Sequence, residues 1–226
     1  MNNAIIVQTC WSVDNRQVIW QGCYYETLRL TLMRHSAYAR AQKFDYWIKM
    51  GDIHPEYMTG AWSKCFLILE ALEAGYQDVV YIDTDAAVMD FETDLRSALP
   101  EGKFIGAVLH TPDKSEFLKV NNVPPHYNVG VLYFRNSPRT IEFVKAWIAT
   151  YPGKERWLEQ GSFNDMVTGE YADMFHQVDD RFNATVNVNM TDKPAVKGWH
   201  GIMTVANRLA VMTEELADDF IKFRVL

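Results

Sequence analysis

The sequence predicts an α/β protein with a mostly parallel central sheet that is flanked by helices. Two observations carry this prediction. Short apolar runs rich in β-branched residues alternate along the chain with longer stretches in which apolar residues recur every three or four positions. One of these runs, residues 79–82, is apolar throughout, which is typical of a parallel strand covered on both faces. Strands that alternate with helices are joined by right-handed crossovers and form such a sheet.

The first part of the chain supplies two helices and three strands. The stretch 21–41 has apolar residues from Tyr24 to Met33 at helical spacing. The stretch 60–74 has a second apolar face, and Gly75 follows it as a stop signal. The strands are expected at residues 4–9, 44–50 and 79–82, with a polar loop at 10–16 after the first.

The second part of the chain is less regular. A helix is expected at 138–150, because Pro138 is favoured in a first helical turn, and a buried strand is expected just before it at 129–134. The remaining expected elements are strands at 103–109, 174–178 and 195–199, helices at 161–168 and 213–223, and a polar loop at 110–126. The sequence has no repeat, low-complexity tract or linker composition, so we expect one domain over residues 1–226.

The composition restricts the classes of partner and compartment. The 226 residues carry a net charge of −7 and are 48% apolar, which is ordinary for a globular protein. Such an acidic chain is not expected to bind nucleic acid through its phosphates. The three cysteines suit a reducing compartment better than a disulfide framework. No run reaches the length of a membrane span, and the first residues are typical of a strand and not of a signal peptide, so we expect a cytoplasmic protein.

The most informative segment is the end of the apolar run at 79–82. Asp83 and Asp85 follow it at spacing i and i+2, where the strand opens into a loop. The carboxyl edge of an open α/β sheet is where ligands collect. Two carboxylates at that edge suit a divalent cation that is itself held by the phosphates of a substrate. An Asp-x-Asp alone arises often by chance, and its position at a strand end gives it weight.

Three other segments place polar groups at expected strand or helix ends. The first, 126–134, leads into a buried strand, and its glycine allows close approach of the backbone. The second, 159–165, is a polar cluster at a helix start, and the third, 197–201, contains a cation, an aromatic ring and an imidazole. Each also has a simpler explanation, namely turn formation, helix capping and a structural histidine, respectively.

Taken in order, the four segments resemble a known family. A strand with Asp-x-Asp, then Asn-x-Gly with a strand, then Glu-Gln-x-x-x-Asn and a late Trp-His-Gly resemble the metal-dependent nucleotide-sugar glycosyltransferases of the GT-A fold. The resemblance covers about residues 4–201 and is nearest to the galactosyl- and mannosyltransferase-like branch, which Trp62, Ser63 and Lys64 also resemble. Glu159 stands where many relatives have Asp, and the Trp-His-Gly segment is compact, without a longer His-glycine-lysine-proline signature.

The resemblance implies a single-domain GT-A glycosyltransferase. It would move a sugar from a nucleoside-diphosphate sugar, with UDP favoured, to a hydroxyl of a glycan or glycoprotein acceptor. It implies a nucleotide-binding half at about residues 1–110 and a half at about 111–226 that completes the acceptor and metal sites. With no membrane anchor in the sequence, a bacterial or viral soluble enzyme, or an excised catalytic domain, fits this description.

The resemblance also implies a bound manganese (or magnesium) ion that bridges the two phosphates of the donor. Its ligands would be Asp83, Asp85 and His200, and imidazole beside oxygen ligands suits manganese better than magnesium. The cation and Lys197 would stabilise the leaving diphosphate as its charge develops. The other residues implied to bind the donor, besides Asp83 and Lys197, are Thr9, Trp11, Lys64, Asn128, Gly130, Gln160, Asn164, Trp199 and Gly201.

The stereochemical course depends on the acidic residues near the reacting carbon, for which Glu159 and Asp165 are the candidates. If one of them deprotonates the acceptor hydroxyl, the reaction inverts configuration. If neither can, a retaining route on the same face of the sugar is open.

Three other functions are compatible with parts of the sequence. A haloacid-dehalogenase-like phosphatase also has an apolar strand that ends in Asp-x-Asp, although there the pair normally ends the first strand. A nucleotidyltransferase is less consistent, because it would have a glycine-rich basic loop after the first strand. A non-catalytic sugar- or nucleotide-binding module would use the 13% of aromatic residues for stacking on sugars. Turnover of a sugar nucleotide with manganese separates an enzyme from such a module.

Overall fold

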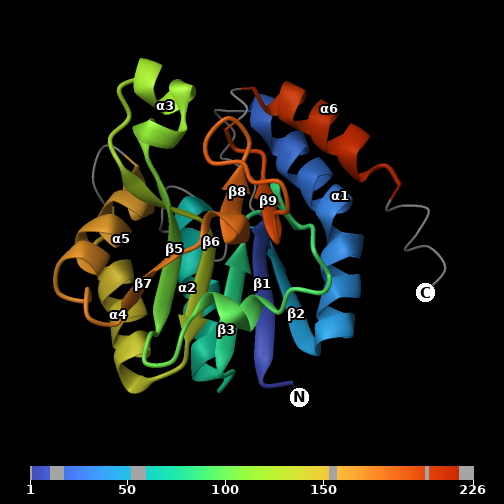
Figure 1. Ribbon diagram of the computed structural model, residues 1–226. Coiled ribbons are helices and arrows are strands. Elements are labelled where there is room, and N and C mark those ends of the chain that lie inside the picture. Colours follow the sequence, from blue (N-terminus) through green and yellow to red (C-terminus); the bar gives the residue numbers. More distant parts are fainter. Residues whose placement is uncertain (1, 11–17, 52–59, 153–156, 202–203, 219–226) are drawn as a thin grey trace.

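The central sheet has six strands in the order β2-β1-β3-β6-β5-β7 (Figure 1). The structure is a computed structural model, and it describes residues 2–10, 18–51, 60–152, 157–201 and 204–218. The pairs β1–β2, β1–β3 and β5–β7 are parallel, whereas β6 runs antiparallel to both of its neighbours. The strands are β1 (Ala4–Cys10), β2 (Phe44–Met50), β3 (Asp78–Ile82), β5 (Ile105–His110), β6 (His126–Arg135) and β7 (Phe175–Val178). The predicted α/β class with a mostly parallel sheet is therefore confirmed, with β6 as the antiparallel exception.

Both faces of the sheet are covered around β1 and β3, which explains why these two strands are buried almost throughout. In β1, Ile5 and Val7 pack with the helices α2 (Ser63–Glu73), α4 (Pro138–Ala149) and α5 (Leu158–Thr168). Ala4 and Ile6 point the opposite way and pack with the end of the long helix α1 (Val18–Gln42). Because side chains alternate along a strand, each half of the strand's residues belongs to a different core.

One helix begins where the sequence predicts and another begins earlier. The Ser137 hydroxyl accepts a hydrogen bond from the Thr140 backbone N–H and Pro138 occupies the first turn, so α4 begins where predicted. The last described helix, α6 (Val205–Leu216), begins eight residues before the predicted 213, because the Thr204 hydroxyl caps it by accepting from the Asn207 N–H. Residues 219–223 of the predicted helix lie outside the described residues.

Several short elements were not predicted. The loop expected at 110–126 contains helix α3 (Glu116–Val120), which Ser115 caps. Single 3₁₀ turns occupy Leu95–Ala98, Pro112–Lys114 and Asp180–Asn183, and the start of the predicted helix 60–74 is a 3₁₀ turn at Gly60–Trp62. They are too short to produce a periodic sequence pattern.

A second sheet of three short strands brings distant segments together. Its order is β4 (Ala86–Val88), β9 (Val196–Gly198) and β8 (Ala184–Thr185). Ala86 pairs with Gly198 in an antiparallel register, so the segment after Asp85 lies beside the segment before His200. Two of the four polar sequence segments therefore meet in space.

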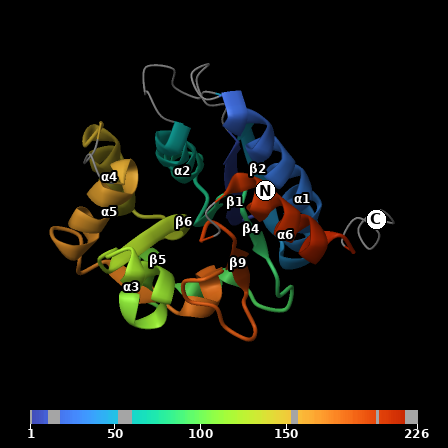
Figure 2. The same ribbon diagram turned by 90° about the horizontal axis from the view of Figure 1, so that it is seen from above.

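The connections around β1 create a place for a ligand. β1 lies between β2 and β3, and the crossover helices α1 and α2 cover opposite faces of the sheet. Ligands of open α/β sheets bind outside the carboxyl ends of the strands where the winding reverses. Here that point lies beyond the ends of β1 and β3, next to Asp83. Seen from above, β4 and β9 lie at the same end of the molecule as α6, which packs against α1 (Figure 2).

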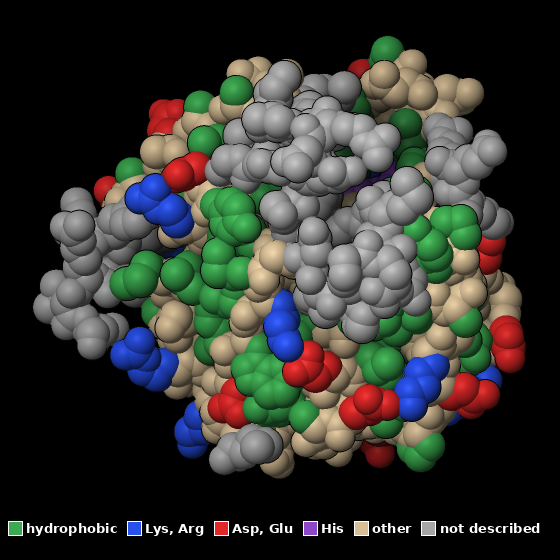
Figure 3. Space-filling view, turned by 180° about the vertical axis from the view of Figure 1, so that it is seen from behind, with side chains coloured by type: hydrophobic (Ala, Val, Ile, Leu, Met, Phe, Trp, Pro, Cys, Tyr) green, Lys and Arg blue, Asp and Glu red, His purple; other side chains and the backbone are tan. Residues whose placement is uncertain are grey.

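Two features of the described residues bear on membranes and on surface charge. None of the helices in the described ranges is long and apolar enough to cross a membrane. On the described part of that face, acidic and basic side chains are interspersed (Figure 3).

Candidate active site

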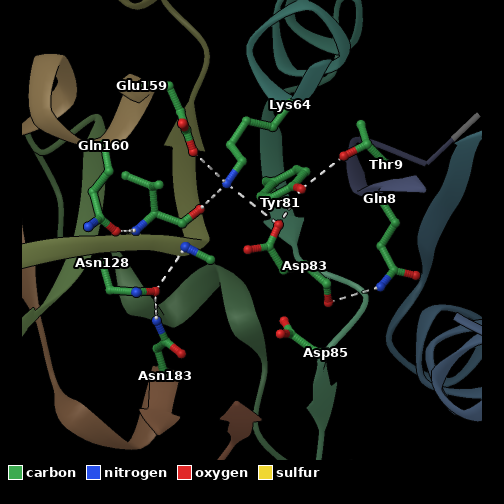
Figure 4. Close-up of polar contacts among 12 residues, drawn as sticks. Gln8, Thr9, Lys64, Tyr81, Asp83, Asp85, Asn128, Glu159, Gln160 and Asn183 are labelled. Carbon is green, nitrogen blue, oxygen red and sulfur yellow. Dashed lines mark hydrogen bonds and ion pairs between the residues drawn. The ribbon is translucent and has the colours of Figure 1, made fainter. Parts of the chain in front are cut away.

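Asp83 and Asp85 occupy the turn between β3 and β4. The turn is closed by a hydrogen bond from the Ala86 N–H to the Asp83 carbonyl at 3.1 Å, and the Asp83 N–H donates to the Gly130 carbonyl of β6 at 2.7 Å. Both carboxylates point to the side on which Asn128 lies (Figure 4). The sequence prediction that this pair stands at the carboxyl end of a buried strand is confirmed.

Asp83 is held by a chain of hydroxyl groups from β1 and β3. The Tyr81 hydroxyl donates to Asp83 Oδ1 at 2.5 Å, which leaves the Thr9 hydroxyl, 3.0 Å away, to donate to the tyrosine oxygen. Burial and the nearby Asp83 carboxylate raise the pKa of Tyr81 well above its ordinary value, so it remains a donor. Gln8 also donates to the Asp83 carbonyl at 3.3 Å. Thr9 therefore contributes to the site indirectly, because it holds the Tyr81 hydroxyl that orients Asp83.

Lys64 is a buried cation between two carboxylates. Its Nζ lies 3.5 Å from Asp83 Oδ1 and 3.3 Å from Glu159 Oε1, and it donates to the Val129 carbonyl at 3.2 Å. Burial alone would lower the pKa of Lys64, but Asp83 and Glu159 outweigh burial and raise it above its ordinary value. Lys64 therefore stays charged and ties α2, β3 and α5 together.

Asp85 is paired with an arginine that the sequence analysis did not select. Arg208 Nη1 of α6 forms an ion pair with Asp85 Oδ2; Asp85 is buried and the Arg208 side chain is largely covered. The Arg208 Nη2 also donates to the His200 carbonyl at 3.4 Å, and the Trp199 N–H donates to the Asp85 carbonyl at 2.9 Å. Asp85 and the segment around His200 are therefore directly connected.

His200 lies close to Asp83 across Gly130. A Cβ placed on Gly130 would be 3.1 Å from Asp83 Oδ2 and 3.4 Å from His200 Cε1, so only glycine allows both side chains to approach here. The His200 Nε2 is 3.0 Å from the Thr185 hydroxyl, whereas its buried Nδ1 has no hydrogen-bond partner. Burial lowers the pKa of His200 to about 4, although Asp83 acts in the opposite direction, so the imidazole is neutral at pH 7.

A second row of polar side chains lines β6 opposite the aspartates. Asn128 Oδ1 accepts from the Gly130 N–H at 2.8 Å and from Asn183 Nδ2 at 2.9 Å. Gln160 Oε1 of α5 accepts from the Val129 N–H at 3.2 Å. Figure 4 shows these residues around the same space as Asp83 and Asp85. The predicted residues Asn128, Gly130 and Gln160 are thus brought together with the aspartates.

The two candidate catalytic acids occupy different environments. Glu159 is buried in the first turn of α5 and forms the ion pair with Lys64. Asp165 is exposed further along the same helix. Asn164 uses both ends of its amide on the Tyr127 backbone, accepting at 2.6 Å and donating at 2.9 Å. Asn164 therefore fastens α5 to the edge of β6, which is a structural use of the group.

Three residues of the 197–201 segment face away from the aspartates or into packed protein. Lys197 Nζ contacts Glu215 of α6 at 2.5 Å and lies 5.3 Å from the centre of the Trp199 ring. Trp199 is fully buried among apolar residues of α6 and β4, and its Nε1 donates to Glu215 at 3.2 Å. Gly201 packs against the backbone of Val186. Trp11, implied by the resemblance to bind the donor, lies outside the described residues.

Gly201 is expected to be required for folding and not for donor contact. A Cβ at this position would lie 1.9 Å from the Val186 carbonyl oxygen, a backbone atom that cannot move aside alone. We therefore expect Gly201→Ala to lower the free energy of unfolding by about 1–3 kcal/mol, as overpacking does. Urea unfolding followed by circular dichroism measures this change. An unchanged midpoint would show that the Val186 segment can shift freely.

The residue types at the site fit a divalent cation. Asp83 keeps 32% of its side chain exposed, and the neutral His200 has a buried nitrogen without a partner. Two carboxylates and an imidazole form a donor set that suits manganese. Among the described residues, however, no three His, Cys, Asp or Glu side chains are already grouped as metal ligands. One reason is visible, since Asp85 is engaged by Arg208.

Sequence reasoning missed the residues that hold the candidate site residues in place through hydrogen bonds and an ion pair. They are Gln8, Tyr81, Asn183, Thr185 and Arg208. Tyr81 could have been found, because it precedes Asp83 by two positions and therefore emerges on the same face of the strand. The others depend on pairings between segments far apart in the chain, for which no local signal exists.

Comparison with known proteins gives a family and a fold. A model of the nucleotide-diphospho-sugar transferase family matches residues 41–213. No curated protein matches the sequence. Among solved structures, a glycosyltransferase involved in the glycosylation of the major capsid of PBCV-1 superposes with a TM-score of 0.64 at 14% identity, over 93% of this chain and 99% of that one. The galactosyltransferase LgtC, solved with donor and acceptor sugar analogs, gives 0.53 at 14% identity, over 93% and 95%. The bifunctional glycosyltransferase WbbM gives 0.52 at 13% identity, over 96% of this chain and 51% of that one.

Proposed function

Because the chain belongs to the nucleotide-diphospho-sugar transferase family, we propose that this glycosyltransferase uses a UDP-sugar and a divalent cation held by its Asp-x-Asp motif. The acceptor we propose is a hydroxyl of a glycan or glycoprotein. The nucleotide would bind to the half at about residues 1–110, and the half at about 111–226 would complete the metal and acceptor sites. The family favours glycosyl transfer over the phosphatase and the non-catalytic module considered from sequence.

One observation carries the proposal. Asp83 and Asp85 of the β3–β4 turn and His200, which follows β9, converge beyond the carboxyl ends of β1 and β3, where ligands of such sheets bind. Together they supply two carboxylates and an imidazole, a donor set that suits manganese. A bound manganese ion would supply charge to stabilise the departing diphosphate.

The remaining polar residues have roles that follow from their positions. We assign Asn128 and Gln160 to sugar hydroxyls, because their amide groups retain further donor capacity. Lys64 keeps Asp83 ionised and oriented. Of the two candidate acids, Glu159 is linked to this arrangement through its ion pair with Lys64, so it is our candidate for the residue beside the reacting carbon, whereas the exposed Asp165 is a weaker one.

Calorimetric titration with UDP tests the proposal. We expect UDP to bind at least about tenfold more tightly with manganese than after chelator treatment, because cation and diphosphate would share one site. Uridine, which lacks phosphates, is the matched control and should show no such dependence on manganese. Equal affinity for UDP in both conditions would contradict the proposed metal site. Hydrolysis of a panel of UDP- and GDP-sugars then identifies the donor.

A further inference from the structure

Arg208 occupies an unexpected position in the site. It comes from α6, far from the aspartates in sequence, yet its guanidinium forms an ion pair with Asp85 Oδ2. Only 12% of its side chain and 7% of that of Asp85 are exposed, so both charges are largely withdrawn from water. The second terminal nitrogen donates to the His200 carbonyl at 3.4 Å. Arg208 thus touches both segments proposed to hold the cation, the turn with Asp83 and Asp85 and the segment around His200.

The ion pair and a cation bound to Asp85 compete for one carboxylate. A guanidinium and a divalent cation on the same buried oxygen repel each other strongly, because the protein interior screens charge less than water does. A buried charge that loses its partner is also unfavourable. Arg208 can therefore leave Asp85 only if another positive charge takes its place and another anion receives the guanidinium.

The diphosphate of a donor is such an anion. Guanidinium groups bind phosphate oxygens in a bidentate manner. Lys197, which the sequence had suggested for this task, is instead held by Glu215, and Lys64 is held by Asp83 and Glu159. Lys64 also pairs with a proposed metal ligand, Asp83, but Glu159 and the Val129 carbonyl hold it in place as well. Arg208 pairs with Asp85, the carboxylate that the incoming metal would take.

We propose that Arg208 is an exchangeable cation of this site. It neutralises Asp85 in the empty enzyme and moves onto the diphosphate oxygens when Asp85 ligates a divalent cation. This inference rests on the proposed function. The exchange is a movement of the side chain and not of the helix, because α6 is fixed by the fully buried Met212 and Leu216 and by the contacts of Glu215 with Lys197 and Trp199.

Two titrations of Arg208→Gln test the exchange, because they should shift in opposite directions. Without nucleotide, manganese alone should bind about tenfold more tightly than to the wild type, since the competing charge is gone. With saturating manganese, UDP should bind about tenfold more weakly, since the diphosphate has lost its arginine. Damage to the fold would weaken both. Calorimetry, with electron paramagnetic resonance of free manganese as a second readout, measures these affinities.

Two further variants complete the experiment. Arg139→Gln removes an exposed arginine that pairs with Asp173 away from the site, and it should change neither affinity. Arg208→Lys retains the charge but not the bidentate geometry, and it should show the same two opposite shifts in smaller size. It also carries the test if Arg208→Gln does not fold.

The outcomes separate this inference from the proposed function. If manganese strengthens UDP binding to the wild type but binds no more tightly to the Arg208 variants, the exchange is overturned and the function stands. If UDP binding to the wild type is independent of manganese, the function falls and the exchange falls with it.

Discussion

Asp85→Asn is expected to reduce kcat for sugar transfer by about 10²–10³-fold, the usual effect of removing one group that stabilises developing charge. The amide has the shape of the carboxylate but no negative charge, so it is a poor ligand for a hard divalent cation. Its oxygen can still accept a hydrogen bond from Arg208, and its backbone carbonyl still accepts from the Trp199 N–H. We therefore expect the fold to be retained while UDP release from the donor falls.

Asp90→Asn is the matched control for this variant. Asp90 follows β4, five residues after Asp85, but its carboxylate pairs with Arg181 and Thr93 outside the site. Turnover of Asp90→Asn should stay close to that of the wild type. Circular dichroism and a manganese titration of both variants distinguish lost metal binding from lost structure. Wild-type turnover in Asp85→Asn would remove Asp85 from the catalytic site.

The sequence was informative where the signal is local. The apolar run before Asp83 predicts a buried strand, and the abrupt change to carboxylates marks its end, so the position of the pair at the edge of the sheet followed directly. Helix α4 was located by its proline, and α6 was misplaced because the cap at Thr204 precedes a weakly apolar first turn. Local chemistry thus fixes where elements start only when their first turn is distinctive.

The sequence was less informative about the direction of strands in the sheet and about which side chains contact one another. The antiparallel course of β6 depends on how the chain returns to the sheet, which residue types do not encode. Lys197 and Trp199 match a donor-binding pattern, but the alternation of side chains along and after β9 turns both toward α6. Arg208 matches no donor-binding pattern in the sequence but lies in the site, because its contact with Asp85 spans 123 positions and has no local sequence signal.

Lys64→Met is expected to be the most destabilising substitution at the site. Methionine keeps much of the volume of lysine but removes the charge between Asp83 and Glu159, which would face each other with no cation between them. Breaking a buried ion pair by removing one partner costs about 3–5 kcal/mol of unfolding free energy. Urea unfolding at pH 7 measures the loss.

The dependence of this loss on pH shows whether charge is its cause. Burial already raises the pKa of Asp83 in the wild type, with Lys64 acting against it and Asp85 adding to it. Without Lys64 the pKa of Asp83 rises further above that of the unfolded chain, so the destabilisation is present at pH 7 and is relieved as the pH falls toward 4 and Asp83 takes up a proton. The difference in stability between wild type and Lys64→Met should therefore shrink over that range.

Lys145→Met is the control for an ion pair in water. Lys145 Nζ lies 2.7 Å from Glu73 Oε1, but 56% and 48% of these side chains are exposed. Such a pair contributes at most about 1 kcal/mol, because water and salt screen it. A similar loss in both lysine variants, or a loss in Lys64→Met that is the same at pH 7 and pH 4, would indicate that Lys64 acts through packing of its aliphatic chain. The position of Asp83 would then depend on Tyr81 and the turn, and the site would tolerate the loss of its buried cation.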